Sequence, residues 1–466
     1  MEETPPQKTI IAADQRLSQS IVWEIQRHYF LQNGMKAWQE DVVPHQISCS
    51  PVMARSYSQL VFGYLRDCFA AWQAGTFELY LAEPLYIVEL GAGSGRLLYH
   101  FLHQFYPLFE ESPFAELPIK FVLTDFVPSI IEFWQGHEKL QPWVEAGLLD
   151  FGLFDVMKPE PLRLRNSQAT LTADSVINPI ILFANYFFDS IPQDSFVQED
   201  GLLCENLLTV LSSQPEPDLA DPTIWERLEW AYEPIPLGET YYEEPLYNEI
   251  LASYEAQLPD TVLTFPNVGL DCVRFWQEVA NGRLLLLSSD RGHTLADSLL
   301  DQEDPLPNRH GSFSLMVNYH AIGEYVWQSG GEVLHAPHYQ DNLQTVAYLL
   351  GEVPQGGKET RMAFETAVIQ GGPDDFFALK QSVEPQIAQL TLPQLLSFLR
   401  LSAWDADLFQ VCLPALLAHV EQASPAWYPD IADVVAQVWR QYLPLKAPDP
   451  LEEQVHQLLE RLGEST

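Results

Sequence analysis

The sequence predicts an α/β protein in which seven strands form one mostly parallel sheet with helices on both faces. Short runs rich in Ile, Val, Leu and Phe alternate with stretches of helical spacing, as in doubly wound folds. The runs are apolar almost throughout, which is typical of strands buried on both faces. They are LYIVEL (85–90), KFVLTDF (120–126), LDFGLFDV (149–156), IILFAN (180–185), RLLLLSSD (283–290), SFSLMVNY (312–319) and GEVLHAP (331–337).

A helical N-terminal segment, residues 1–80, precedes the first run. Apolar residues recur at every fourth position from Leu17 to Tyr29, and Asn33-Gly34 supplies a left-handed stop, so we expect a helix over 14–32. Ser50-Pro51 combines a capping hydroxyl with proline at the first helical position and predicts the start of a second helix. We expect both helices to cover the start of the sheet.

The sheet domain, residues 81–350, contains a long insertion and is followed by helices. From about 197 to 262 the chain is rich in Glu, Pro and Tyr and shows no clean period. An insertion of this length is more typical of a lid or substrate wall than of a passive loop. From 374 to 466, four stretches with helix start signals predict a C-terminal all-α domain. This domain is either a surface for a protein partner or a second copy, or a structural appendage.

Charge and cysteine usage limit the partners. The chain of 466 residues has 64 acids and 24 bases, a formal net charge of -40, so it repels phosphate backbones and nucleic acid is a poor partner. Its five cysteines are far apart and form no C-x-x-C pair, which predicts a reducing compartment and no thiolate zinc site. The start MEETPPQKTI is unlike a signal peptide, and no apolar run reaches the ~18 residues of a membrane span. We expect a soluble, cytoplasmic, acidic protein that binds no metal.

The stretch YIVELGAGSGRLLYHF (86–101) joins the first strand to a helix. Glycine permits a sharp turn and close approach of a ligand to the main chain, and the helix start offers free N–H groups. In the dinucleotide fingerprint G-x-G-x-x-G the third glycine comes three residues after the second. Here Gly95 comes two after Gly93, which disfavours a dehydrogenase. With Glu89 before Gly91, the stretch has the E-x-G-x-G-x-G pattern of class I methyltransferases, whose acid holds the ammonium group of S-adenosylmethionine (SAM).

Acids also end the next two strands. Asp125, followed by Phe126, suits the two ribose hydroxyls of such a cofactor. Asp155 suits the adenine amino group, with Phe154 against the ring. Ligands of doubly wound sheets bind outside the carboxyl ends of the strands, so three successive acids there predict one Rossmann-like cofactor site.

The fourth strand ends in Asn185-Tyr186-Phe187-Phe188-Asp189, where a methyl acceptor would face the cofactor. An amide beside aromatic rings can orient a flat nitrogen acceptor by hydrogen bonding and stacking. Asp189, Asp290 and His320 are candidates for the base that accepts its proton.

Several of these segments resemble the MidA-like class I methyltransferases, a family that includes mitochondrial complex I assembly factors. FANYFFDSIPQDSF is similar to the family's N-E-h-F-D-A-L-P element, VELGAGSGRL to its SAM loop, LLLLSSDRGH to its I-D-Y-G-like strand and SLMVNYHAIGEYVWQSGGEVLHAP to its H-V-D-F segment and final hairpin. The resemblance covers about 50–350. Three positions depart from it: Tyr186 replaces a glutamate, Arg291 the I-D-Y-G tyrosine and Asn318 the H-V-D-F acid. If those carboxylates hold a guanidinium, their loss argues against arginine methylation.

We therefore predict a SAM-dependent methyltransferase that acts on a nitrogen or another nucleophile, on a protein or another acceptor. The predicted cofactor-binding residues are Glu89, Gly91, Ala92, Gly93, Gly95, Arg96, Asp125, Phe126, Phe154, Asp155 and Asn185, and the predicted catalytic residues are Asn185, Asp189, Asp290 and His320. The alternative is a non-catalytic assembly or scaffold protein that keeps the SAM fold and binds partners through its C-terminal helices. Amino-group methylation of a nucleic-acid base is disfavoured by the charge and by the missing prolines of the N-P-P-aromatic loop.

Overall fold

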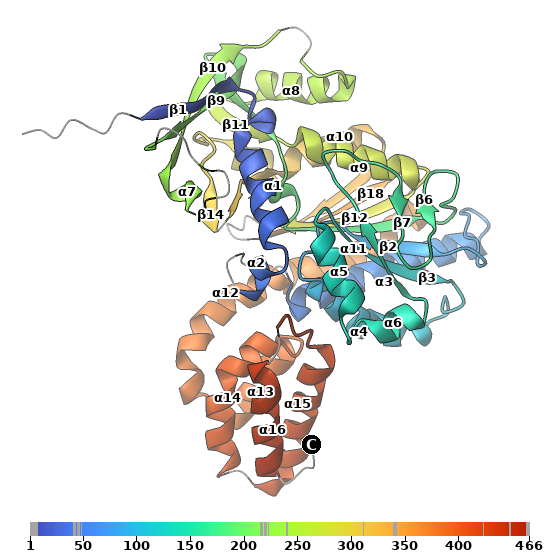
Figure 1. Ribbon diagram of the computed structural model, residues 1–466. Coiled ribbons are helices and arrows are strands. Elements are labelled where there is room, and N and C mark those ends of the chain that lie inside the picture. Colours follow the sequence, from blue (N-terminus) through green and yellow to red (C-terminus); the bar gives the residue numbers. More distant parts are fainter. Residues whose placement is uncertain are drawn as a thin grey trace, which may run out of the picture.

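A sheet of mostly parallel strands lies at the centre of the protein, as predicted (Figure 1). The computed structural model describes residues 8–40, 43, 47, 49–214, 218, 221, 223–238, 241–310, 312–338, 343–422, 424–446 and 449–462. The first residues of the chain, on which the signal-peptide prediction rests, lie outside this part up to residue 7. In the order of the sheet, the strands are β17 (Glu332–His335), β18 (Gln344–Leu350), β12 (Leu284–Asp290), β7 (Ile180–Asn185), β2 (Leu85–Glu89), β3 (Ile119–Asp125) and β4 (Leu149–Leu153).

The strands from β12 to β4 are parallel, whereas β18 runs antiparallel to both β12 and β17. One predicted strand is wrong: residues 312–319 do not join this sheet, and β18 takes a place in it instead. The run breaks up because the Asn318 side chain accepts a hydrogen bond from the Ala321 N–H at 2.9 Å and caps a helix. Its parts form short pairings: β15 (Ser312–Ser314) with β14 (Asn308–His310), and β16 (Val317–Asn318) with β13 (Gly292–His293).

Helices cover both faces of the sheet, because successive side chains of each strand point to opposite sides. Ile87 and Phe121 belong to the core on one face, and Val88 and Val122 to the core on the other. The first face is covered by α3 (Pro51–Gln73), α4 (Arg96–Glu110), α5 (Pro128–Gly136) and α11 (Lys358–Phe364). The second face is covered by α8 (Pro245–Gln257), α9 (Asn267–Val279) and α10 (Tyr319–Gln328). The predicted helix start at Ser50-Pro51 is confirmed, since Ser50 caps α3.

The insertion forms a second sheet, where the sequence showed no period. The sheet is antiparallel and contains β1 (Thr9–Gln15), β8 (Asp194–Glu199), β9 (Leu202–Ser212), β10 (Leu228–Pro236) and β11 (Thr261–Phe265). Residues 215–217, 219–220, 222 and 239–240 of the insertion lie outside the described part. The helix predicted over 14–32 therefore starts late, because residues up to Gln15 pair with β9. This helix is α1 (Ile21–Asn33), and a short second helix, α2 (Lys36–Gln39), follows it.

The C-terminal helices form a block with its own hydrophobic core, seen below the sheet in Figure 1. They are α12 (Pro373–Val383), α13 (Leu392–Leu401), α14 (Ala406–Val420), α15 (Tyr428–Gln441) and α16 (Pro450–Leu462). The segment after α15 contacts the main domain: Arg96 Nε donates to the Leu443 carbonyl at 3.1 Å, and Lys139 Nζ to the Tyr442 carbonyl at 2.8 Å. None of the helices in the described part is both long and apolar enough to cross a membrane.

Candidate active site

The glycine-rich turn between β2 and α4 adopts the conformation that requires glycine. Gly91, Gly93 and Gly95 have φ angles of 58°, 51° and 73°, in the left-handed region where a side chain would be strained. The Ala92 N–H donates to the Thr124 carbonyl at 2.8 Å and so ties the turn to the end of β3. The three alternating glycines thus allow the chain to turn sharply at the carboxyl end of the sheet.

Aromatic rings pack against the turn and use the space that its missing side chains leave. A Cβ on Gly93 would lie 2.5 Å from the Trp38 ring of α2, and one on Gly91 would lie 3.0 Å from Phe187. A Cβ on Gly95 would lie 2.9 Å from Nε1 of Trp134, so Gly95 packs on α5. The bare main chain therefore serves contacts within the protein as well as any approach of a ligand.

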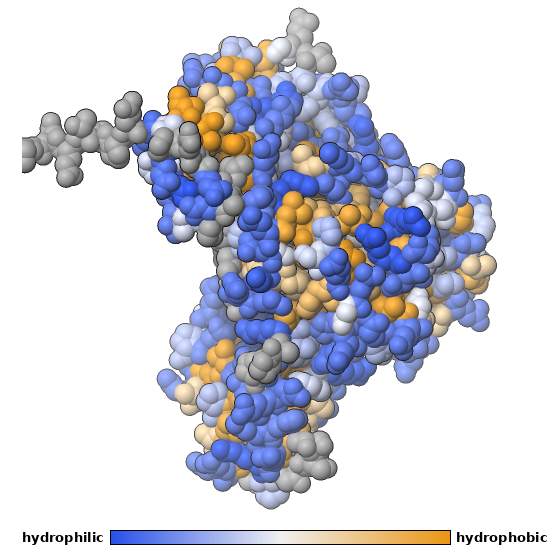
Figure 2. All heavy atoms as spheres, viewed as in Figure 1, coloured by the Kyte–Doolittle hydropathy of each residue, from blue (hydrophilic) through white to orange (hydrophobic). Residues whose placement is uncertain are grey.

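A cavity of about 590 Å³ opens beside the turn, between the sheet edge and the N-terminal segment. Figure 2 shows apolar side chains gathered beside α1 at the centre of the visible face, while much of the remaining surface is hydrophilic. Of the predicted site residues, the cavity is lined by Glu89, Gly91, Ala92, Gly93, Asp125, Phe126, Phe154, Asn185 and Asp189. The structure thus brings together the ends of β2, β3 and β7 around one space.

Two buried carboxyl groups lie at the cofactor side of this cavity. Glu89 accepts a hydrogen bond from the Leu98 N–H at 3.2 Å, and Asp125 accepts one from the Gly93 N–H at 3.1 Å and one from Val127 at 2.9 Å. Burial raises the pKa of Glu89 to about 8 and that of Asp125 to about 6. In the described part of the chain, neither carboxyl forms an ion pair with a basic side chain. A cation or hydroxyl donors bound beside these carboxyls would favour their ionised forms and lower their pKa values.

Asp155 is not among the residues that line the cavity, and Arg27 of α1 binds it. The guanidinium donates to both carboxylate oxygens, at 3.0 and 2.8 Å, and lies 4.6 Å from the centre of the Phe126 ring. Both side chains of the pair are about a third exposed, at 32% and 29%. This ion pair fastens α1 across the sheet edge, and the adenine contact of Asp155 stays a prediction.

The backbone at the end of β7 is strained, and the side chain of the last strand residue accepts a hydrogen bond from a buried helix. Tyr186 has a φ of 49°, which is unusual for a bulky residue and is found mostly where the surroundings enforce it. Its neighbour Asn185 accepts a hydrogen bond at 3.2 Å from the hydroxyl of Tyr57, a buried residue of α3. The Tyr57 hydroxyl also lies 2.9 Å from Ser289 Oγ on β12. This network fixes the direction in which the Asn185 amide enters the cavity.

Asp189 and Asp290 form a carboxyl pair next to Asn185. They are 3% and 0% exposed, and the Asp189 N–H donates to Asp290 Oδ2 at 3.1 Å. Burial, and then the charge and hydrogen bond of the Asp189 carboxyl, raise the pKa of Asp290 well above its usual range. A raised pKa means that Asp290 favours its protonated form. Of these two residues, Asp189 lines the cavity, and Asp290 lies behind it.

Two further predicted residues lie away from the cavity. Arg96 binds the C-terminal segment through Leu443 and lies 5.4 Å from the Tyr442 ring centre. His320 lines a separate cavity of about 640 Å³, where its Nδ1 is 3.0 Å from the Tyr254 hydroxyl. The geometry therefore supports neither Arg96 as a cofactor ligand nor His320 as the base.

Sequence reasoning missed the side chains that the N-terminal segment contributes. Arg27 and Trp38 reach the site from α1 and α2, and Tyr57 reaches it from α3. The four-residue spacing of α1 indicated which face is buried, and it could not show which part of the sheet that face covers. Arg291, noted only as a departure from a family pattern, also lines the cavity.

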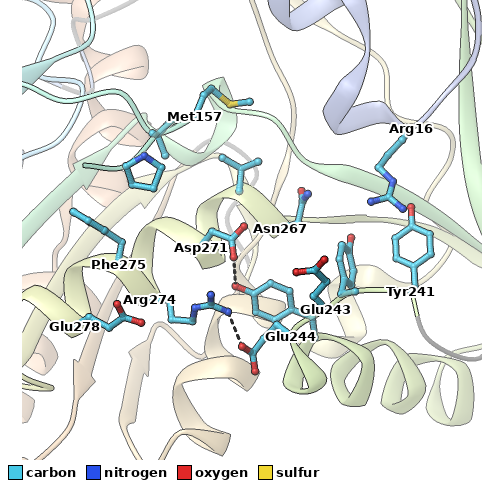
Figure 3. A pocket seen from close by; sticks show the side chains of 15 residues that line it. Arg16, Met157, Tyr241, Glu243, Glu244, Asn267, Asp271, Arg274, Phe275 and Glu278 are labelled. Carbon is cyan, nitrogen blue, oxygen red and sulfur yellow. Dashed lines mark hydrogen bonds and ion pairs between the residues drawn. The ribbon is translucent and has the colours of Figure 1, made fainter. Parts of the chain in front are cut away.

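A second cavity, of about 700 Å³, adjoins the first and shares Val156 and Met157 with it. Figure 3 shows Arg16 beside Tyr241 on one wall and the residues of α8 and α9 on the other. Several charged groups here already have partners within the protein. Arg274 binds Glu244 at 2.6 Å, Asp271 accepts from the Tyr247 hydroxyl at 2.9 Å, and Arg16 binds Glu205 at 3.3 Å.

The sequence matches no family model and no curated protein. The structure is similar to two crystal structures from Burkholderia thailandensis, each with 12% sequence identity. One, an "uncharacterized ACR, COG1565 superfamily protein", has a TM-score of 0.44 over 73% of this chain and 89% of that chain. The other, a "COG1565 superfamily member and likely methyl transferase" bound to S-adenosyl-homocysteine, has a TM-score of 0.41 over 68% and 79%. Residue roles in this chain therefore rest on its own site.

Proposed function

We propose that the protein is a SAM-dependent methyltransferase that transfers a methyl group to a nucleophilic atom such as nitrogen. One observation carries the proposal: two buried carboxyls, Glu89 and Asp125, lie without a cationic partner in the described structure, beside a left-handed glycine turn that lines the same cavity. Unpaired buried carboxyls are costly to ionise, and a cationic, hydroxyl-rich ligand offsets that cost.

The residues that fit the cofactor follow from their chemistry. Glu89 would pair with its ammonium group, and Asp125 would accept from its ribose hydroxyls, since each carboxylate oxygen can accept a second hydrogen bond. Phe126 and Phe154, from the ends of β3 and β4, would flank the adenine ring. Trp38, packed on Gly93, would close this end of the cavity against water.

SAM, when bound, supplies a methyl group already activated by its positively charged sulfur. The protein then has to orient the acceptor and remove its proton. Asn185, Tyr186 and Asp189 line the cavity on the acceptor side, and the pair of Asp189 and Asp290 accepts the proton that the acceptor loses. Placing the second carboxyl behind the first raises the proton affinity of the pair above that of an ordinary aspartate.

Titration of SAM and of S-adenosylhomocysteine by calorimetry tests the proposal. We expect binding to wild type, and a loss of at least about tenfold in affinity in Glu89→Gln and in Asp125→Asn, since each removes a charged hydrogen-bond partner. Glu116→Gln, an exposed acid on the same domain, is the matched control and should bind as wild type does. Absence of heat with wild type, or equal binding by all four proteins, would contradict the cofactor site.

The rival function is a scaffold that keeps the SAM fold without turnover. The ion pair of Arg27 and Asp155 favours it, because it engages the strand-end acid that was expected to bind adenine. The two are separated by turnover: the pure protein is incubated with SAM and cell extract, and S-adenosylhomocysteine is measured. Product that depends on Asp189, and is lost in Asp189→Asn, supports the enzyme. SAM binding without product supports the scaffold.

A further inference from the structure

We infer that the methyl acceptor carries a carboxylate and that Arg291 binds it. This inference rests on the proposed function, and it concerns the part of the cavity that the cofactor residues do not reach. Arg291 follows directly after β12, and β12 lies beside β7 on the side away from β2 and β3. Arg291 is thus separated by the end of β7 from Glu89 and Asp125, and it lies on the acceptor side.

The backbone of Arg291 is held firmly in this place. Its N–H donates to Asp290 Oδ1 at 3.2 Å, and its carbonyl accepts from the Val317 N–H at 2.9 Å. The next residue, Gly292, pairs with Val317 in the β13–β16 ladder, and a Cβ there would lie 2.4 Å from the Val317 carbonyl oxygen. The side chain of Arg291 therefore starts from a fixed position and contributes to the wall of the cavity.

Arg291 has no carboxylate partner within the described structure, and its Nε is buried without a hydrogen bond. This is unexpected in a chain with 64 acids and 24 bases. The other arginines around the two cavities are paired: Arg27 with Asp155, Arg16 with Glu205 and Arg274 with Glu244. A partly buried guanidinium whose N–H groups have no acceptor is stabilised by a bound anion. A carboxylate suits it well, because its two oxygens can accept two parallel hydrogen bonds from the planar guanidinium.

A second group in the same cavity lacks a partner. Ser20 is 2% exposed, and its Oγ is buried with no hydrogen bond. Ser314 and Asn308 line the cavity as well. Hydroxyl and amide groups donate to carboxylate oxygens without adding charge. Besides the cofactor residues Glu89 and Asp125, the acids in the described lining are Glu24 and Asp189. Arg291, whose guanidinium has no carboxylate partner in the described structure, supplies the positive charge that offsets these acids for an incoming anion.

The test uses matched pairs of aromatic probes, because Trp23, Tyr186 and Phe187 line the cavity. The protein is saturated with S-adenosylhomocysteine, and benzoate and benzamide, then indole-3-acetate and indole-3-acetamide, are titrated by calorimetry or ligand-observed NMR. In wild type we expect each carboxylate to bind about tenfold or more tightly than its amide. Arg291→Gln should abolish this preference, and Arg291→Lys should retain part of it.

The control variant is Arg461→Gln, which makes the same change in charge at an exposed surface ion pair with Glu421. It should keep the carboxylate preference, and Arg291→Gln should keep the S-adenosylhomocysteine affinity of wild type. A preference that persists in Arg291→Gln, or the absence of any carboxylate preference in wild type across both pairs, overturns the inference. Wild type that fails to bind S-adenosylhomocysteine overturns the proposed function instead, so the two failures are distinguishable.

Discussion

Glu89 shows how much of the site depends on the surroundings of one residue. It ends a fully buried strand, it receives one N–H from α4, and it lies near a second carboxyl, Asp125. Because its pKa is about 8 against 4.5 in the unfolded chain, ionisation of Glu89 makes the empty protein less stable as pH rises between these values. A bound cation would reverse this effect and lower the pKa.

SAM binding at pH 7 should therefore release about one proton, most of it from Glu89. The measurement is calorimetry in phosphate and in Tris, whose ionisation enthalpies differ, so that the change in heat counts protons. Glu89→Gln should release far less, and the affinity of wild type should rise from pH 6 to pH 8. Equal proton release by both proteins would show that Glu89 does not bind the cation.

At this scale the sequence predicted the acids at the ends of β2 and β3, because a strand end fixes where a residue lies. It did not show the ion pair between Asp155 and Arg27, because Arg27 lies 128 positions away along the chain and no local pattern records the contact. Likewise Tyr57 behind Asn185 is an ordinary core residue in the sequence, and only the fold shows its hydroxyl beside the site.

At the scale of elements, the N-terminal segment acts as the cover of the cavity. Trp38 of α2 lies on Gly93, and Phe30 of α1 stacks on Trp38 with ring centres 5.7 Å apart. The cover is thus joined to the glycine turn by aromatic contacts, and Arg27 adds the ion pair to Asp155.

Gly93→Ala should destabilise the protein for two separable reasons. Its φ of 51° strains any side chain by about 1–2 kcal/mol, and the new methyl would collide with Trp38. In a Trp38→Ala background the collision is absent, so the same change should cost only the backbone strain. Urea unfolding of the four proteins in a double-mutant cycle measures the difference. Gly147→Ala is the control, because its φ is 72° and nothing lies within 4 Å. Additive effects in the cycle would mean that Trp38 does not contact the turn.

Strands and helices were predictable where the local pattern agreed with the fold. The apolar runs of β2, β3, β4, β7 and β12 needed no partner to be recognised. β1 and the strands of the insertion were not recognised, because their residues show no regular alternation in the sequence. They form a sheet through pairing of β1 with β9, about 200 residues away along the chain. The run at 312–319 ends at Asn318, which caps the start of α10. This local signal was missed because the surrounding residues are apolar and resemble a strand.

At the scale of the whole molecule, the segment after α15 is one of the places where the C-terminal helices are fastened to the main domain. Lys139 Nζ donates to the carbonyls of Trp439 and Tyr442 at 3.2 and 2.8 Å and lies 4.2 Å from the Trp439 ring centre. His137 reaches Pro444 at 2.8 Å, and Gln39 of α2 donates to the Leu445 carbonyl at 2.5 Å. The same segment thus touches both the main domain and the cover of the cavity. The predicted division into 1–80, 81–350 and 374–466 stays a prediction.

Lys139→Met should loosen this attachment while leaving both cores intact. It removes two hydrogen bonds and a cation–π contact, together worth about 1–3 kcal/mol. Hydrogen exchange should become faster in residues 439–446 and in α2, with little change in β2 and β3. Lys120→Met, on β3 and without a described contact to the C-terminal helices, is the control. Unchanged exchange in 439–446 would show that Lys139 contributes nothing to the attachment.

The pairing of β1 with β9 has a consequence for how the protein is made. The partners of residues 9–15, at 208–212, are added to the growing chain roughly 200 residues after them. Since α1 and α2 directly follow β1, the cover of the cavity cannot settle until the middle of the chain has been translated. Until then Trp23 and Trp38 are hydrophobic side chains without their packing partners on a nascent polypeptide, and a chaperone that shields this stretch can act until β9 has been made.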